Sequence, residues 1–364
     1  MGADATTTAD ELLARLDGGD DLFLLDVREP DEFAAWSIGA ATLIPLGELE
    51  ARLDEVPSDR DVVVTCASGP RAVRAQEVLA RHGRASSVLA GGMGAWGNVY
   101  DAVDGVLGDV SVTQVRRRGK GCLSYVLCGG GRAVVIDPSL ETGRYVDVAR
   151  SHGVAITHVL DTHLHADHVS GARDLVAATG ATLLLNPTDG FAYDFTPITD
   201  GLVIDLGDAH LAVSAVSAPG HTEGSTIYRL GEVAVFTGDT LFLESVGRPD
   251  LADQAEAYAH ALYQSLHRHV LPLPDDDLVF PAHFSPSVTV RGGEFLCARL
   301  GDLRTTLPAL ALTEEEFVSW AVGRATDRPG NYREIVQFNA GRSTKDVDEM
   351  RTLEIGPNRC AIAS

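Results

Sequence analysis

Cysteine is scarce in this 364-residue chain, and no two of its five cysteines form a Cys-x-x-Cys pair. Their odd number and irregular spacing exclude a regular disulfide framework and a cysteine-rich structural zinc site. Free thiols suit a reducing compartment, so we expect a cytoplasmic protein. Basic residues are also scarce, 29 against 52 acidic ones, and the net charge of −23 argues against a nucleic-acid partner.

Long apolar runs are missing as well. No segment approaches the roughly 18 apolar residues that would span a membrane, and the N-terminus has neither the basic nor the apolar stretch of a signal peptide. We therefore expect no membrane association. The chain does have 45% hydrophobic and 22% charged residues, which is typical of globular proteins, and its length predicts two or three domains.

Residues 1–98 alternate short apolar strands with helices. Residues 22–27 and 62–65 are expected strands, and a helix is expected from about Arg71 to Gly83. This alternation predicts an α/β domain, a parallel sheet flanked by helices. Residues 99–109, which contain glycines and acidic residues, are the expected linker, and residues 110–364 form the expected second domain.

Cys66 lies between an apolar strand and a helix, in the pattern Cys-Ala-Ser-Gly-Pro-Arg. A loop that curls at a helix N-terminus directs backbone N–H groups inward, so Ser68 and Gly69 are expected to line a nest that binds a thiolate or persulfide anion. Arg71 adds positive charge. The alternative, a buried structural thiol, would fit an isolated cysteine better than this strand–loop–helix context.

Two segments that flank this loop in the sequence, residues 25–33 and 89–96, resemble signatures of the rhodanese family. The resemblance covers about the first hundred residues. It implies that Cys66, with Arg71, is catalytic: Cys66 would take a sulfane sulfur from a donor such as thiosulfate and pass it to a thiol. One departure is residues 35–40, which replace the Gly-His-Ile-x-Gly-Ala often found in the family.

A second concentration of reactive side chains follows the apolar residues 157–160. Residues 162–168 read Thr-His-Leu-His-Ala-Asp-His, and later apolar strands are followed by His221, Asp239 and His283. Loops at the ends of strands in one sheet converge, and imidazole and carboxylate groups suit zinc or iron. A lone histidine is usually a core or surface residue, but five histidines in this pattern predict a metal site.

The pattern His-x-His-x-Asp-His, then His, Asp and His, resembles the metallo-β-lactamase superfamily and implies an αββα sandwich. Further segments resemble the persulfide dioxygenase family, which holds one ferrous ion: residues 120–125, 135–138, 246–251 and 329–332. By matching position, the ligands of one Fe(2+) per chain would be His163, His221 and Asp239, with open positions for O₂ and substrate. Four more residues would support these ligands or form a second metal site: His165, Asp167, His168 and His283.

The same resemblance suggests residues of the substrate pocket. Arg248 would bind a carboxylate of the thiol carrier, or would instead form a structural ion pair with Asp250. Cys122 would line the pocket wall, or would be a small buried residue of a strand. Phe284 and Ser285 stand where the family often has Asp-Tyr, which leaves the substrate preference open.

Together the resemblances imply a sulfur-metabolism enzyme, a thiosulfate sulfurtransferase fused to a persulfide dioxygenase. The first domain would load sulfur onto a small thiol, and the second would oxidise this persulfide with O₂ to sulfite and regenerate the thiol. The alternatives are a glyoxalase II-like hydrolase with two Zn²⁺ ions and a rhodanese module that only carries sulfur or docks a partner. The identity of the thiol and homo-oligomerisation stay open.

Overall fold

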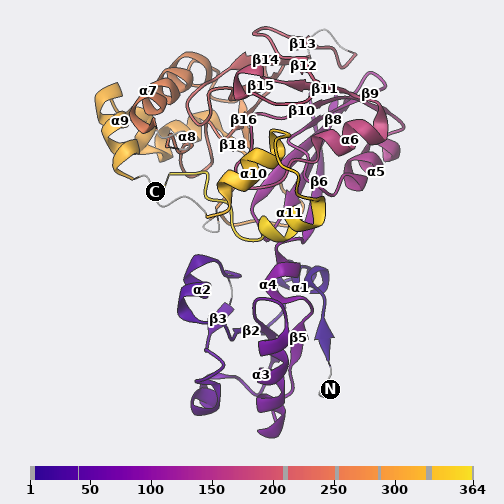
Figure 1. The fold of residues 1–364 in the computed structure, drawn as a ribbon, viewed down its shortest axis with the longest axis vertical. Helices are drawn as coiled ribbons and strands as arrows, with labels where there is room; N and C mark the ends of the chain where they lie inside the picture. The colour runs from indigo at the N-terminus through magenta and orange to yellow at the C-terminus, as the bar shows by residue number, and fades with distance from the viewer. Residues whose placement is uncertain are drawn as a thin grey trace. The chain divides into compact units, whose positions relative to one another are not determined.

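The computed structural model describes residues 5–39, 41–207, 212–250, 254–285, 288–324 and 330–362. The chain divides into two compact units (Figure 1): residues 1–101 with 117–120 and 355–357, and residues 102–116 with 121–354 and 358–364. Residues 40, 251 and 329, which belong to motifs quoted above, lie outside the described ranges. Within those ranges, no helix is long and apolar enough to cross a membrane.

The first unit is a parallel sheet with helices on both faces, as expected. Its strand order is β1-β5-β4-β2-β3, and each adjacent pair is parallel. The strands are β1 Thr6–Thr7, β2 Leu22–Asp26, β3 Ala41–Leu43, β4 Asp61–Thr65 and β5 Ser87–Leu89. The helices are α1 Ala9–Asp17, α2 Pro30–Ala35, the 3-10 helix η1 Leu49–Glu55, α3 Pro70–Arg81 and α4 Gly92–Trp96.

Successive side chains of strand β4 enter two separate apolar clusters. Val62 and Val64 pack against α3 and η1 on one face, and Val63 packs against α1 and α4 on the other. Because successive residues of a strand point to opposite faces, an unbroken apolar run is what a strand covered on both sides requires. The run ends at Thr65, so Cys66 stands at the carboxyl end of the sheet, directly before the loop that leads into α3.

Residues 99–109, the expected linker, contain a strand. β6 Tyr100–Leu107 is the edge strand of the larger sheet and lies beside β7 Val110–Arg117. The presence of Gly105 is one reason why this segment is expected to be a linker. A Cβ at this position would lie 2.5 Å from the Phe295 ring, so the glycine serves packing. The division into domains 1–98 and 110–364 stays a prediction.

The second unit contains two sheets, which form the expected αββα sandwich with helices on their outer faces (Figure 1). The first sheet has the order β12-β11-β10-β9-β8-β7-β6, with β8 Cys122–Gly129, β9 Arg132–Ile136, β10 Ala155–Leu160, β11 Thr182–Leu185 and β12 Thr196–Pro197. The second runs from β13 to β18: β13 Val203–Ile204, β14 Val213–Ser217, β15 Thr226–Leu230, β16 Ala234–Gly238, β17 Leu278–Pro281 and β18 Ala298–Arg299.

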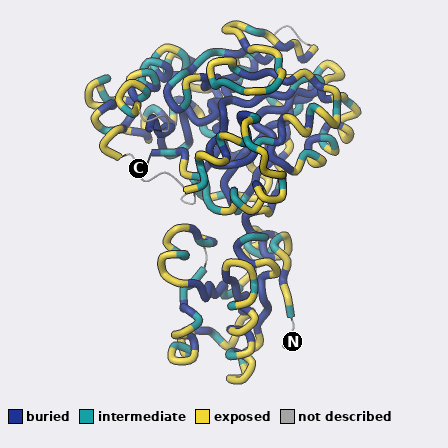
Figure 2. Tube along the Cα trace, viewed as in Figure 1, coloured by how far each residue is buried: buried dark blue, intermediate teal, exposed yellow. Residues whose placement is uncertain are grey.

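Two apolar layers hold this unit together, and its strands are largely buried (Figure 2). Tyr125 of the first sheet packs edge-on against Phe236 and Phe280 of the second, and its ring centroid lies 4.8 and 5.6 Å from theirs. The residues directly before these phenylalanines, Val235 and Val279, point to the opposite face of the second sheet. They pack against the outer helices α7 Ala255–Ser265, α8 Leu300–Thr306 and α9 Glu314–Gly323.

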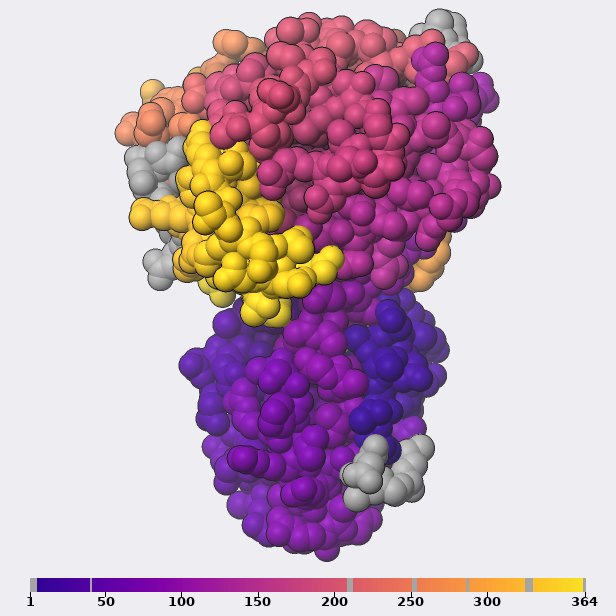
Figure 3. All heavy atoms as spheres, turned by 45° about the vertical axis from the view of Figure 1, so that its right-hand side comes forward, coloured from indigo at the N-terminus to yellow at the C-terminus, as the bar shows by residue number. Residues whose placement is uncertain are grey.

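The remaining helices lie on the side of the first sheet. Helices α5 Gly143–Ser151 and α6 Ala172–Thr179 contact strand β10. Helices α10 Tyr332–Asn339 and α11 Val347–Leu353 share a small apolar cluster, which includes Ile335 and Met350, with Leu140 and Val169. In Figure 3 this C-terminal segment, in yellow, lies against segments from the middle of the chain. Three short helical turns complete the unit: η2 Pro187–Asp189, η3 Leu266–Val270 and η4 Pro308–Ala311.

Candidate metal centre and sulfur-transfer site

Four loops at the carboxyl ends of strands carry the histidines and carboxylates singled out in the sequence. Residues 161–168 follow β10, His221 follows β14, Asp239 follows β16 and His283 follows β17. Strands β16 and β17 are adjacent and parallel, so Asp239 and His283 leave the sheet at the same edge. The seven side chains are buried, with at most 6% of any residue exposed. The structure therefore brings together the residues that the sequence pattern groups.

His163, His221 and Asp239 form one group, whose donor atoms lie within 4.8 Å of one another. Asp239 Oδ2 is 3.5 Å from His163 Nε2 and 3.3 Å from His221 Nε2. All three atoms are buried, and none has a hydrogen-bond partner among the described residues. A buried polar atom left in this state costs roughly 1–3 kcal/mol, and one cation about 2 Å from each would satisfy all three. These residues fit the metal ion that the fold implies.

The hydrogen bonds of both imidazoles turn their Nε2 lone pairs toward this point. His221 Nδ1 lies 3.0 Å from the carbonyl oxygen of Arg248, which can only accept a hydrogen bond. Burial is the main cause that lowers the pKa of His221 to about 4, so the ring is neutral at pH 7. His163 Nδ1 lies 2.9 Å from the Thr162 hydroxyl, which donates to Asp137. These contacts would keep the proton of both rings on Nδ1 when a cation binds, so that Nε2 is the nitrogen each ring offers to it.

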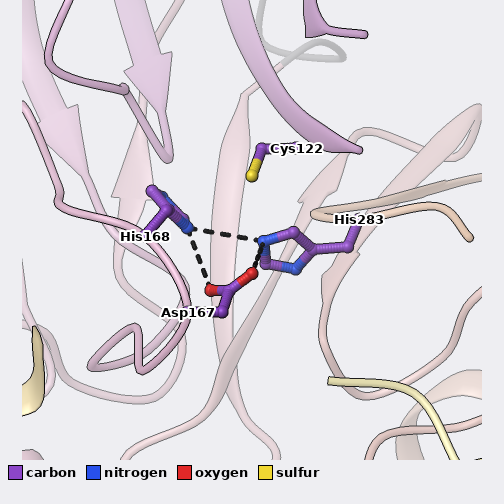
Figure 4. A group of neighbouring side chains, drawn as sticks. All are labelled: Cys122, Asp167, His168 and His283. Atoms are coloured by element: carbon purple, nitrogen blue, oxygen red, sulfur yellow. Dashed lines mark hydrogen bonds and ion pairs between the residues drawn. The ribbon is translucent and has the colours of Figure 1, made fainter. Parts of the chain in front are cut away.

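A second group consists of Cys122, Asp167, His168 and His283, whose donor atoms also lie within 4.8 Å of one another (Figure 4). Burial raises the pKa of the Cys122 thiol, but His168 and His283 outweigh burial and bring the pKa to about 7. Cys122 is thus a small buried residue of a strand, as one of the two sequence interpretations has it. What the sequence did not indicate is its position among the residues of this second group.

His165 lies in neither group, although the sequence pattern places it with Asp167, His168 and His283. Its Nε2 is 3.1 Å from Asp137 Oδ1, and burial is the main cause that lowers the pKa of His165 to about 3. Asp137 also accepts a hydrogen bond of 2.6 Å from the backbone of Thr162. With φ at 51°, Asp137 is in the left-handed region, a strained conformation for a residue other than glycine. His165 and Asp137 thus hold the shape of the loop that carries His163.

Three further residues hold the ligand loops, and sequence reasoning missed them. Asn339 on α10 donates to the carbonyl oxygens of His165 and His168, at 2.9 and 2.8 Å. Glu354 accepts a 2.7 Å hydrogen bond from the backbone of Val169. Asp189 accepts hydrogen bonds from the backbones of Leu164 and Gly224, both at 2.8 Å. No local pattern in the sequence marks these positions, because each contact spans 25 residues or more.

A cavity of about 570 Å³ opens beside His221. Its walls come from the loops around residues 164–166 and 221–223, from Tyr258, and from the helix α10, which supplies Tyr332 and Arg333. A volume of this size is ordinary for a small-molecule site. The cavity gives a ligand access to one of the three candidate metal ligands, and Arg333 places a positive charge in its wall.

Arg248 is buried and forms a two-pronged ion pair with Asp250, at 2.7 Å for both contacts. This is the structural alternative that the sequence left open, and Arg248 is not among the residues that line the cavity. Its carbonyl oxygen instead anchors His221. The neighbouring Gly247 passes so close to Asp239 that a Cβ would lie 1.9 Å from the Asp239 carbonyl oxygen. The Gly-Arg-Pro-Asp motif therefore positions two candidate ligands.

In the first unit, Cys66 lies at the junction of β4 and α3, and one backbone donor of the expected nest reaches its sulfur. The backbone N–H of Gly69, whose φ of 119° favours glycine, donates to Cys66 Sγ at 3.1 Å. Met93 and Gly94 at the start of α4 donate to the carbonyl oxygens of Cys66 and Ala67, at 2.8 and 3.1 Å. The sulfur is buried under a loop whose residues 67 and 68 are exposed. This arrangement gives an anion of sulfur at least one backbone donor, as a sulfur-transfer site needs.

Arg71 and Arg28 both form contacts with helix α2 or with the residue that ends it. Arg71 forms two contacts of 2.6 and 2.7 Å with Glu32, and this pairing lowers the pKa of Glu32 to about 2. Arg28 binds Asp26 and the carbonyl oxygen of Trp36, both at 2.6 Å. Arg71 thus lies near the loop but is paired with a carboxylate, while Asp26 and Arg28 organise the fold.

Comparisons with known proteins agree with this architecture. Residues 8–98 match the rhodanese-like domain, and residues 117–283 match the metallo-beta-lactamase superfamily. The chain is 33% identical to the mitochondrial persulfide dioxygenase ETHE1 of Bos taurus over 207 residues, which are 55% of this chain and 76% of the relative. It is 36% identical to a hydroxyacylglutathione hydrolase of Rhodospirillum rubrum over 169 residues, 44% of this chain and 60% of the relative.

Among solved structures, ETHE1 from Myxococcus xanthus matches with a TM-score of 0.56 and 28% identity. The match covers 63% of this chain and 98% of that structure. The extent and the identity of these matches point to the same family as the buried histidine and carboxylate groups at the strand ends. The chain therefore belongs to the family of the persulfide dioxygenase ETHE1, with the metallo-β-lactamase fold preceded by a rhodanese-like domain.

Proposed function

We propose that this protein is a persulfide dioxygenase that uses one ferrous ion, fused to a sulfurtransferase. The observation that carries the proposal is the set of three unpartnered buried atoms of His163, His221 and Asp239. Two imidazoles and one carboxylate on one face are the donor set of non-haem iron oxygenases. The overall reaction would be R–S–SH + O₂ + H₂O → R–SH + SO₃²⁻ + 2H⁺.

When bound there, a ferrous ion would supply the redox chemistry that activates O₂. The chain's own residues would bind and orient the substrate. The cavity beside His221 would hold the thiol carrier with its terminal sulfur toward the three ligands, and Leu164, Ala166 and Val336 would exclude water from its wall. Arg333 would attract a carboxylate of the carrier. The ion pair with Asp250 makes Arg248 a poorer candidate for that role.

In the first domain, Cys66 would be the nucleophile of sulfur transfer. The Cys66 thiolate attacks the outer sulfur of thiosulfate, which leaves sulfite and a Cys66 persulfide. A small thiol then takes this sulfur, giving R–S–SH and the free Cys66 thiolate. The N–H of Gly69 would stabilise the anionic sulfur. Ser68 and Arg71 would lie near the entering donor. The product is the substrate proposed for the second domain.

The alternative of a dizinc thioester hydrolase requires Asp239 to be shared between two metal ions. Here only Asp239 Oδ2 faces His163 and His221, while Oδ1 lies 2.7 Å from His283 Nδ1. With Oδ1 held by this imidazole, Oδ2 is the oxygen that Asp239 would direct at a cation of the first group, although Asp239 also lies in another candidate group with His283 and Cys360. This geometry favours a single metal ion at the group of His163.

Metal analysis of anaerobically purified protein, together with O₂ uptake on glutathione persulfide, tests the proposal. We expect about one iron per chain, and His221→Ala should lose both the iron and the O₂ uptake. His152→Ala, a change of an exposed histidine at the end of α5, is the matched control and should keep both. Full O₂ uptake by an iron-free protein with tightly bound zinc would overturn the assignment.

A further inference from the structure

We propose that residues 358–362, called the tail below, position the metal centre, and that Ile362 is the residue on which this role depends. The tail lies along the segment that carries Arg248, whose carbonyl oxygen faces His221. This role rests on the metal binding proposed above. It belongs to a part of the chain beyond residues 117–283, the stretch that matches the metallo-beta-lactamase superfamily.

The tail pairs with residues 246–248 in the manner of an antiparallel strand. The backbone N–H of Arg248 donates to the carbonyl oxygen of Cys360 at 2.8 Å. The backbone N–H of Ile362 donates to the carbonyl oxygen of Val246 at 3.0 Å. Two hydrogen bonds in opposite directions form one ring of an antiparallel ladder, so they fix the register of the two segments as well as their separation.

Residues 246–248 also contact the backbone that carries Asp239. Val246 forms an antiparallel bridge with Leu241, and a Cβ on Gly247 would lie 1.9 Å from the carbonyl oxygen of Asp239. Successive peptide groups of a strand point to opposite edges, so residues 246–248 form a middle strand between the segment of a candidate ligand and the tail. Without the tail, this middle strand would be held along one edge only.

The tail thereby holds the group that orients the His221 ring. Arg248 donates its N–H to the tail, and its carbonyl oxygen lies 3.0 Å from His221 Nδ1. A shift of the Arg248 backbone would move this oxygen and turn the imidazole, whose Nε2 lies 3.3 Å from Asp239 Oδ2. The partner of the nitrogen that does not bind the metal sets the orientation of a ligand ring. The tail therefore acts on the metal centre through two successive hydrogen bonds.

The side chain of Ile362 supports His221 from a second direction. Ile362 is buried in the apolar cluster that contains Leu262 of α7. Leu262 packs against the turn before His221, since a Cβ on Gly220 would lie 2.4 Å from the Leu262 Cα. The backbone and the side chain of Ile362 thus both reach the surroundings of one candidate ligand.

Further hydrogen bonds fix the tail at both ends. The side-chain amide of Asn358 donates to the carbonyl oxygens of Gly121 and Phe284, at 3.2 and 2.9 Å. At the other end, the hydroxyl of Ser245 donates to the carbonyl oxygen of Ile362 at 2.8 Å. These contacts keep the pairing between the tail and residues 246–248 in register.

Co²⁺ binding to metal-free full-length protein tests this role, because the visible d–d absorption of Co²⁺ reports both the affinity and the ligand geometry. The part of the absorption that His221→Ala removes belongs to the group of His163. Ile362→Pro deletes the N–H that bonds to Val246. We expect it to weaken this part of the Co²⁺ binding about tenfold and to change the spectrum at saturation. Ile362→Val keeps the N–H and most of the side chain, so it should retain the wild-type affinity and spectrum.

A folded Ile362→Pro protein with wild-type Co²⁺ affinity and spectrum would refute the proposal even if it unfolds at a lower temperature, because the tail would then only stabilise the fold. If Ile362→Pro does not fold, Ser245→Ala decides: weaker Co²⁺ binding supports the role, and unchanged binding refutes it. A wild type without the His221-dependent absorption would overturn the metal site and this role together. Co²⁺ binding that responds to Ile362→Pro, in a protein that does not oxidise persulfide, would refute only the proposed reaction.

Discussion

Gly247→Ala should weaken metal binding, although Gly247 offers no ligand. A Cβ at this position would lie 1.9 Å from the carbonyl oxygen of Asp239 and 3.2 Å from the Cβ of His221. Real Cβ atoms essentially never approach a heavy atom closer than 3.0 Å, so the Asp239 backbone must move by about 1 Å. Overpacking of this kind costs roughly 1–3 kcal/mol. A displacement of supporting groups lowers metal affinity by about 10- to 100-fold.

The assay compares thermal unfolding and iron affinity of Gly247→Ala with those of the wild type and of Gly143→Ala. Gly143 begins α5, has no atom within 4 Å of an added Cβ and has a φ that any residue adopts. This control should leave the midpoint of unfolding and the iron affinity unchanged or slightly raise the midpoint. The reasoning fails if Gly247→Ala, fully folded, binds iron as tightly as the control does.

Three further predictions test the independence of the two sites and the contribution of two ion pairs. Cys66→Ser should abolish sulfur transfer from thiosulfate and leave O₂ uptake on supplied persulfide intact, whereas His163→Ala should do the reverse; a Cys66→Ser protein that holds iron but cannot oxidise supplied persulfide would contradict this division. Glu32→Gln should lower the unfolding temperature at pH 7. Because the pKa of Glu32 is depressed to about 2, the difference from wild type should shrink as the pH falls from about 4.5 to 2, and a pH-independent difference would count against the Arg71 pair. Asp250→Ala removes the carboxylate that pairs with the buried Arg248 guanidinium, so it should cost roughly 3–5 kcal/mol of the free energy of unfolding in urea, and a loss below 1 kcal/mol would show that the pair is unimportant.

The sequence predicts the parts of the fold that rest on local patterns. The apolar run 62–65 predicts a strand covered on both sides, and the histidine-rich loop after residue 160 predicts a group of polar side chains at a sheet edge. Both are found, since strand burial and loop placement follow from the order of neighbouring residues. The edge strand β6 was missed because its glycine reflects the packing of Phe295, which lies 190 residues away.

The composition of the candidate site was harder to predict. The order of residues along the chain puts His165 beside Asp167 and His168. In the structure, however, the loop directs His165 toward Asp137, and Cys122 is the fourth member of the second group. Cys122 comes from a distant strand that pairs with residues around His283. Such a partner is set by the register between strands, and no motif in a single sequence records it.

Asn339 and Glu354 fix the loop that follows β10 through hydrogen bonds, and this affects the order in which the protein folds during its synthesis. The loop and the strand before it leave the ribosome well before α10 and the residue after α11. Until residue 354 has been synthesised, the carbonyl groups of His165 and His168 and the backbone N–H of Val169 lack these partners. The nascent chain would then hold its histidines in a loop that is not yet fixed. Metal loading should therefore be one of the last events in biogenesis, after the chain has folded back upon itself.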